Sequence, residues 1–407
     1  MSYFKYKNNN FFSENVSIKN IAKKIKTPFY LYSGNRIKEN FQSFSSSFKN
    51  VDPLICFSVK ANSNNQILRF LGKLGSGADV VSAGELLKAL KAGIKPNKIV
   101  FSGVGKSPEE LTLAIKKKIL LINAESENEV FLINEISKKL RRITSIGLRL
   151  NPDIDAKTIK KISTGRAEDK FGISKSNLLN FCKKIKKLRH IKLDALSVHI
   201  GSQILTDNPY KKTLKVLSKI IDTLNIKLKF IDLGGGFGIT YRKYDRKIKL
   251  NNYSKLVNKF KKKYKCRIIF EPGRAIVGDT GVLISKIQYL KENKFKTLAI
   301  IDAGMNDFIR PALYGASHDI TPVIKNNKKN KKAIEFVGPI CESSCKFIRY
   351  QNYQKLNEGE LIAILNVGAY GSTLSSNYNT KPLVAEIIVN KNKFKIIRKR
   401  QSLTDII

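Results

Sequence analysis

The hydrophobic pattern of the chain changes near residue 273. Between residues 29 and 273, short apolar runs recur at intervals of roughly 20 to 30 residues, with helix-like segments between them. Such runs predict strands, here at 29–32, 54–59, 79–82, 98–101, 120–123, 146–150, 193–198, 229–233 and 267–270. Strands that alternate with helices favour a parallel sheet, and eight or nine such units predict an α/β fold with a TIM-like (β/α)8 barrel.

The helix-like segments carry start signals of their own. Ser107 is followed by Pro108, Glu109 and Glu110. A serine N-cap, a proline in the first turn and early acidic residues are typical of a helix start, because they satisfy free N–H groups and complement the helix dipole. We therefore expect a helix to begin at Pro108.

Beyond residue 273 the helical patterns become rare. Apolar runs joined by turns predict strands at 277–287, 297–301, 333–337, 360–366 and 384–389. The Lys- and Asn-rich segment 325–332 is typical of a solvated loop. This part of the chain predicts a second, C-terminal domain that is mostly antiparallel β.

Composition limits the classes of protein to which the chain can belong. It has 407 residues, 42% of them hydrophobic, which is enough for the cores of a barrel and a second domain. The net charge is +44, but 15 of the 76 basic residues are arginine, so 61 (76 − 15) are lysine, spread over every region. Specific readers of nucleic acid depend on arginine in local clusters. We expect non-specific attraction to polyanions at low salt and no specific nucleic-acid partner.

The five cysteines are scattered, and their spacing to the three histidines does not match a zinc site. This favours a reducing, cytoplasmic location without structural disulfides or a metal. The longest apolar runs have the length of strands, and residues 1–10 lack the apolar core of a signal peptide. We therefore expect no membrane span.

Candidate chemistry is concentrated where predicted strands end. Lys60 follows the apolar run 54–59, and polar or glycine-rich segments follow three other runs: HIGSQ at 199–203, DLGGGFG at 232–238 and EPGR at 271–274. A lysine at a strand end is most often solvated, but inside a site an amine loses hydration, its pKa falls, and it reacts with carbonyl compounds. The loops that follow barrel strands build the active sites of this fold.

Together these segments match the needs of pyridoxal phosphate, which requires a lysine amine, phosphate donors and a partner for its ring nitrogen. Lys60 supplies the amine, and Gly234, Gly235 and Gly236 allow N–H groups close to a phosphate. Glu271 is suited to holding the ring nitrogen protonated, and His199 to lying against the ring. Tight turns explain glycines equally well, and a core imidazole explains a lone histidine.

Longer stretches of the chain resemble the diaminopimelate decarboxylase family, within the alanine-racemase-like pyridoxal phosphate enzymes. They are FSVKAN (57–62), GADVVSAGEL (77–86), HIGSQI (199–204), GGGFGI (234–239), EPGR (271–274), MNDFIRPALYGASH (305–318), GPICESS (338–344) and GAYGSTLSSNYN (368–379). They follow the family's order over nearly the whole chain. The resemblance implies a barrel at 29–275 and a β domain made of 1–28 with 276–407.

The resemblance also implies a role for each matching residue. Lys60 matches the Schiff-base lysine, and Cys341 matches a proton donor that enters, with Glu342, from the partner subunit of a homodimer. Cofactor contacts are implied for His199, Ser202, Gly235, Gly236, Glu271, Gly273, Arg274 and Tyr370. Contacts with the substrate, meso-diaminopimelate, are implied for Arg274, Arg310, Tyr314, Glu342 and Tyr370. The planar guanidinium of arginine suits carboxylates, and a carboxylate suits an ammonium group.

The implied reaction is decarboxylation of meso-2,6-diaminopimelate to L-lysine, the last step of lysine biosynthesis. The main alternatives are ornithine, arginine or carboxynorspermidine decarboxylases of the same fold. Cys341-Glu342-Ser343 favours diaminopimelate, because the ornithine type usually has Asp after the cysteine. A non-enzymatic cofactor carrier would need neither the substrate arginines nor a second domain.

Two positions depart from the family pattern. Cys345 stands where Asp is common, and Lys381 where Arg is usual. Both departures affect hydrogen bonding near the expected site entrance and leave Lys60, Glu271 and Cys341 unchanged.

Overall fold

The computed structural model describes residues 3–156, 158, 160–241, 245 and 248–407. The chain forms two compact units. One contains Phe41–Ile239 and Arg246–Ala275, and the other contains Met1–Asn40, Thr240–Asp245 and Ile276–Ile407. We describe each unit by itself.

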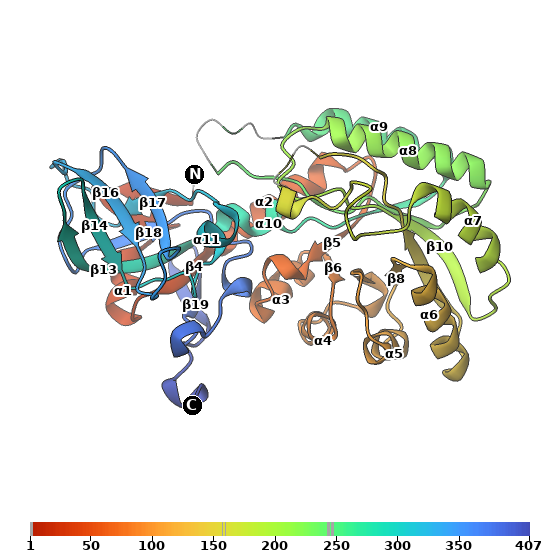
Figure 1. Cartoon of the computed structure of the whole chain (residues 1–407), viewed down its shortest axis with the longest axis horizontal. Coiled ribbons are helices and arrows are strands. Elements are labelled where there is room, and N and C mark those ends of the chain that lie inside the picture. The colour runs from red at the N-terminus through yellow and green to blue at the C-terminus, as the bar shows by residue number, and fades with distance from the viewer. Residues whose placement is uncertain (1–2, 157, 159, 242–244, 246–247) are drawn as a thin grey trace. The chain divides into compact units, whose positions relative to one another are not determined.

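The first unit is a closed barrel of parallel strands (Figure 1). Its eight strands are β5 (Leu54–Ser58), β6 (Gly77–Val80), β7 (Ile99–Phe101), β8 (Leu121–Ala124), β9 (Thr144–Arg149), β10 (Ile191–Ser197), β11 (Phe230–Asp232) and β12 (Arg267–Phe270). Neighbouring strands in the sequence pair with one another, and β12 closes the ring by pairing with β5. Most strand residues are buried, as expected when side chains fill the barrel interior and helices cover its outside. The predicted fold class is confirmed.

Helices connect the barrel strands and cover the outside of the barrel (Figure 1). They are α3 (Asn65–Lys73), α4 (Ala83–Lys91), α5 (Pro108–Lys116), α6 (Glu127–Lys139), α7 (Lys175–Ile185), α8 (Asn208–Leu224) and α9 (Leu250–Tyr264). The predicted start of α5 is confirmed, since Ser107 and Glu110 form a capping box and Pro108 occupies the first turn. Within the described part of the chain, no helix is both long and apolar enough to cross a membrane.

The second unit is built on a nine-stranded mixed sheet. Its strands are β4 (Phe29–Ser33), β13 (Gly281–Glu292), β14 (Lys296–Ile301), β15 (Ile320–Pro322), β16 (Ala333–Val337), β17 (Lys346–Tyr350), β18 (Leu361–Ile364), β19 (Ala385–Asn390) and β20 (Lys393–Arg398). Most ladders are antiparallel, but β14–β16 and β4–β19 are parallel. A small sheet of β1 (Phe4–Lys7), β2 (Asn10–Ser13) and β3 (Val16–Ser17), with α1 (Ile18–Lys24), packs its apolar residues against the core of this unit.

One predicted barrel strand belongs to this second sheet. The run at 29–32 forms β4, which pairs with β13 and β19 instead of with a barrel strand. All five residues of β4 are buried, as are those of β5. A completely apolar strand looks the same in either sheet, so its pattern did not reveal its partners. Residues 29–40 accordingly fall in the β unit, whereas the prediction had put the barrel's start at residue 29.

Candidate active site

A cavity of about 320 Å³ opens where the barrel strands end. Its walls come from loops and strand ends of β5 to β10 and β12, and include Lys60, Ser102, Asn123, Arg149, His199 and Glu271. Lys60, His199 and Glu271, which span more than 200 residues of the sequence, therefore line one pocket. This is the face of a barrel on which active sites form.

Lys60 lies in a tight turn directly after β5 and is held by a buried acid. Its Nζ lies 3.1 Å from Oδ2 of Asp79, a side chain with no exposed surface. The same oxygen accepts a hydrogen bond of 2.6 Å from the Ser58 hydroxyl. The amine therefore has a fixed counter-ion. The sequence had suggested an amine that loses hydration but had not indicated this partner.

A second group of acids lies at the ends of β11 and β12. Glu271 and Asp232 are both buried, and a hydrogen bond joins their side chains. Asp232 also accepts hydrogen bonds of 3.0 Å from the Gly234 N–H and from the Asn123 amide. Burial raises the pKa of Asp232 to about 6, and burial next to Asp232 and Asp79 raises the pKa of Glu271 well above its ordinary value.

This acid group provides a test of whether the pocket fits the expected cofactor. The ammonium of Lys60 lies beside Asp79 and acts on Glu271, while burial, and after it the negative charges of Asp232 and Asp79, raise the pKa of Glu271. A protonated pyridine nitrogen beside Glu271 would add the positive charge that such a cluster favours. The cavity, the amine and the acid therefore fit pyridoxal phosphate.

His199 has a defined tautomer. The N–H of Gly235 donates to its Nδ1 at 3.1 Å, so the ring proton of the neutral form is on Nε2. Loss of hydration in the pocket lowers the pKa of His199 well below its ordinary value, and the positive charges of Lys60 and Arg149 lower it further. A neutral, flat ring on the pocket wall is suited to stacking against an aromatic cofactor.

The glycines predicted as phosphate contacts also have a packing role. A Cβ on Gly235 would lie 2.1 Å from the Glu271 carbonyl oxygen, and one on Gly236, whose φ is +88°, 2.2 Å from the Gly201 carbonyl oxygen. The glycines thus let the loop pack tightly against the loops after β10 and β12. Among the described residues that follow, the next helix is α9, from Leu250, so the predicted phosphate contact would come from the N–H groups of this loop.

Arg274 and Ser202 lie together in the barrel unit. Arg274 begins the short helix α10 (Arg274–Val277), and its Nη2 donates to the Ser202 hydroxyl at 3.0 Å. Gly273 precedes it, and a Cβ there would lie 2.9 Å from Cβ of Ala61. The absence of that carbon lets the Arg274 turn approach the Lys60 turn.

The other predicted substrate residues lie in the β unit. Arg310 begins helix α11 (Arg310–Tyr314) and is buried. Its guanidinium lies 5.7 Å from the Tyr314 ring and 5.6 Å from the Tyr241 ring. Tyr370, predicted to contact cofactor and substrate, has a left-handed backbone with φ +55°.

Cys341 and Glu342 are exposed on a loop of the same unit. The hydroxyl of Tyr378 donates to Oε1 of Glu342, and the hydroxyl of Ser344 donates to Oε2 at 2.9 Å. These two hydrogen bonds lower the pKa of Glu342 and keep it ionised. The departure at Cys345 is accommodated locally, because its buried sulfur accepts the Met305 N–H at 3.3 Å.

The sequence motifs did not point to Ser102, Asn123 and Arg149, which line the pocket, or to Asp79, the partner of Lys60. Ser102, Asn123 and Arg149 lie at or next to the ends of strands that the sequence predicted, whereas Asp79 is near the end of the observed β6 but begins the strand predicted at 79–82. The rule that identified Lys60 and Glu271, a polar side chain where an apolar strand ends, identifies Ser102, Asn123 and Arg149 as well. Its consistent use along all eight strands would have found them.

Comparison with known proteins defines the class first. Residues 34–278 match the family described as "Pyridoxal-dependent decarboxylase, pyridoxal binding domain". The chain belongs to this family, which makes it a pyridoxal phosphate-dependent decarboxylase, and the predicted cofactor and enzyme class are confirmed.

Within that class the chain belongs to the diaminopimelate decarboxylases. It is 41% identical to that of Aquifex aeolicus, over 100% of this chain and 96% of the relative, and 43% identical to that of Helicobacter pylori strain J99, over 94% and 95%. Among solved structures, the Helicobacter pylori enzyme complexed with L-lysine has a TM-score of 0.90 at 42% identity, covering 95% of this chain and 98% of that one. The M. jannaschii enzyme in co-complex with L-lysine has a TM-score of 0.93 at 33% identity, covering 99% and 96%. The predicted family is confirmed.

Proposed function

We propose that this protein decarboxylates meso-2,6-diaminopimelate to L-lysine, as the last step of lysine biosynthesis in the cytoplasm. The observation that carries the proposal is that Lys60, paired with Asp79, lines one cavity together with Glu271. The relatives named diaminopimelate decarboxylase match nearly the whole chain, including the β unit. The five cysteines are unpaired, which suits a reducing compartment.

In this proposal Lys60 holds the cofactor and Asp79 orients its amine. When bound, pyridoxal phosphate supplies an electron sink for the electron pair left by departing CO₂. Glu271 would hold the ring nitrogen protonated, while Asn123, through Asp232, keeps Glu271 in place. His199, on the wall of the same cavity, would lie against the ring and exclude water from it.

The phosphate is assigned to the loops after the barrel strands. The residues assigned to it are Ser202, Gly235, Gly236, Gly273 and Arg274, together with Tyr370 of the β unit. Hydroxyl, guanidinium and loop N–H groups are the donors that bind phosphate oxygens. The 3.0 Å hydrogen bond between Arg274 and Ser202 supports the assignment of both side chains to the phosphate.

The substrate carries two carboxylates and two ammonium groups. Arg274 and Arg310 are assigned to carboxylates, with Tyr314 and Tyr370 beside them, because guanidinium groups bind carboxylates through two parallel hydrogen bonds. Glu342, ionised and held by Tyr378 and Ser344, is assigned to the distant ammonium.

Cys341 is assigned to deliver a proton to the carbon that has lost CO₂. Its thiol is exposed in the single chain, and a proton donor needs a site that excludes bulk water. We therefore propose a homodimer in which Cys341 and Glu342 complete the partner's site.

A substrate comparison tests the function. The purified protein, loaded with pyridoxal phosphate, is offered meso-diaminopimelate, ornithine, arginine and carboxynorspermidine at equal concentrations, and CO₂ release is measured. We expect release from meso-diaminopimelate, with one L-lysine formed per CO₂. Faster release from any of the other three substrates would assign the protein to the alternative decarboxylases of this fold.

A further inference from the structure

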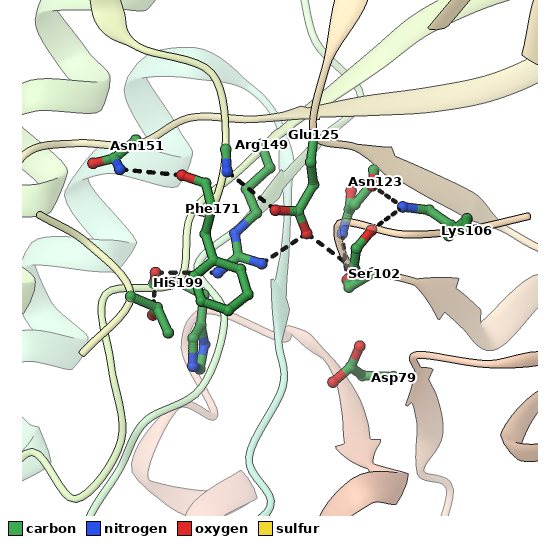
Figure 2. A network of polar contacts seen from close by, with 12 residues as sticks. Asp79, Ser102, Lys106, Asn123, Glu125, Arg149, Asn151, Phe171 and His199 are labelled. Carbon is green, nitrogen blue, oxygen red and sulfur yellow. Dashed lines mark hydrogen bonds and ion pairs between the residues drawn. The ribbon is translucent and has the colours of Figure 1, made fainter. Parts of the chain in front are cut away.

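Lys106 is buried next to the cofactor pocket but does not line it. Its side chain is 1% exposed, and its Nζ forms an ion pair of 2.6 Å with Glu129 in the first turn of α6. The same ammonium donates to the carbonyl oxygens of Gly103 and, at 2.9 Å, Asn123 (Figure 2). The ammonium thus makes two hydrogen bonds to carbonyl oxygens, and Glu129 supplies its counter-charge.

The two carbonyl groups that Lys106 binds belong to the pocket wall. Gly103 and Asn123 both line the cavity. The Asn123 amide donates one proton to Asp232 at 3.0 Å and the other to the Ser102 hydroxyl at 3.2 Å. Ser102 in turn donates to Glu271 at 3.3 Å. A short chain of contacts therefore runs from Lys106 to the acid assigned to the ring nitrogen.

The loop after β7 is also held from its other side. The Gly103 N–H donates to Glu125 at 3.0 Å, and Glu125 pairs with Arg149 at 2.8 Å (Figure 2). Gly103 has a φ of +109°, a conformation that few residues other than glycine adopt. Its N–H and its carbonyl are thus both bound to buried charged groups, which leaves this part of the wall little freedom to move.

We propose that Lys106 is a positioning residue for the cofactor site: through the carbonyls of Gly103 and Asn123 it holds Ser102 and Asn123 where they orient Glu271 and Asp232. This inference rests on the proposed cofactor pocket and not on the identity of the substrate. It assigns Lys106 a task beyond stabilising the fold. A buried ion pair is often replaceable by neutral groups at little cost in stability, but its bonds to these two carbonyls would then be lost.

The test uses a pair of substitutions that removes both charges together. In Lys106→Met/Glu129→Gln no buried charge is left without its partner, and the introduced glutamine keeps an oxygen for the Glu125 N–H that Glu129 now binds at 2.8 Å. Cofactor affinity is measured by titrating the cofactor-free protein with pyridoxal phosphate and following visible absorbance, and stability by thermal unfolding without cofactor. Lys184→Met is the matched control. Lys184 pairs with Glu127, which lies on α6 as Glu129 does, but the Lys184 side chain is 61% exposed.

We expect the double variant to melt close to the parent without cofactor and to bind pyridoxal phosphate about tenfold to a hundredfold more weakly, the cost of one charge-assisted hydrogen bond. The control should match the parent in both measurements. Cofactor affinity equal to the parent's would overturn the proposal, as would a loss of affinity no larger than the control's.

If the double variant does not fold, Ser102→Ala tests the proposal instead. It removes only the hydroxyl between Asn123 and Glu271, so we expect a changed absorbance spectrum of the bound cofactor with unchanged stability of the cofactor-free protein. A parental spectrum and affinity in Ser102→Ala would refute the link between the loop and Glu271. Because both measurements follow cofactor binding, they remain valid even if the substrate proves to be another amino acid.

Discussion

The Nε–H of Arg310 donates to Nε2 of His318 at 3.3 Å. His318 is buried, and its Nδ1 lies 2.9 Å from the Leu365 carbonyl oxygen, which can only accept a hydrogen bond. The imidazole must therefore carry its proton on Nδ1 and offer a bare Nε2 to Arg310. The histidine that ends the MNDFIRPALYGASH stretch thus orients the arginine at the start of helix α11.

Arg310→Lys should weaken substrate binding much more than cofactor binding. A lysine has neither the planar pair of donors for a carboxylate nor an Nε–H for His318. We expect the affinity for meso-diaminopimelate to fall about tenfold to a hundredfold. Binding of substrate and of pyridoxal phosphate is measured separately, with the exposed Arg189→Lys as control. Equal losses for both ligands would instead indicate that Arg310 supports the fold.

Lys60 should be the residue that carries the cofactor. The purified protein should absorb visible light, and borohydride reduction should leave the pyridoxyl group on the peptide that contains Lys60. Peptide mass spectrometry identifies the labelled residue, and a label on another lysine would contradict the assignment. Lys60→Ala should abolish turnover, whereas Lys88→Ala, on the neighbouring helix α4, should retain it.

Glu271→Gln should retain the cofactor but slow decarboxylation about a hundredfold, the usual cost of removing one electrostatic contact in an active site. The amide cannot keep the ring nitrogen protonated, so the cofactor becomes a weaker electron sink. Single-turnover rates with fully loaded protein measure the effect. An unchanged rate would exclude the proposed role of Glu271.

The acid pair should also make the cofactor-free protein less stable as the pH rises. Burial raises the pKa of Asp232 to about 6 and raises that of Glu271 as well. The folded chain therefore holds protons that the unfolded chain releases above about pH 4, so stability falls as the pH rises through these folded-state pKa values. Melting temperatures measured from pH 4 to 8 should show this fall, and Glu271→Gln should reduce it. An equal fall in Glu271→Gln would assign the effect to other groups.

Two inactive chains should restore each other's activity if the site is shared across a dimer. Lys60→Ala and Cys341→Ala chains are mixed under conditions that exchange subunits. Half of the dimers are then mixed, each with one intact site of two, so activity should rise toward about a quarter of wild type. Native mass spectrometry of chains of different mass verifies exchange. Exchange without recovered activity would mean that each site is built within one chain.

The sequence by itself determined the barrel and the kinds of side chain that stand at the ends of its strands. The period of apolar runs predicted all eight barrel strands because each buried strand leaves a local, repeated signal. The same pattern could not assign Phe29–Ser33 to a sheet, because the hydrogen-bond partners of a strand lie in segments far away in the sequence. Strand β4 pairs with β13 and β19, which begin about 250 or more residues later.

Only the tertiary structure decided how the polar groups pair. The sequence indicated that Lys60 ends one strand and Glu271 another, but the partners Asp79 for Lys60 and Asp232 for Glu271 follow from the closure of the barrel, which brings strand ends together. The role of Lys106 was equally hidden among 61 lysines (76 basic residues less 15 arginines). A lysine is distinguished by what surrounds its ammonium, and burial beside two carbonyls and a carboxylate is a property of the folded chain alone.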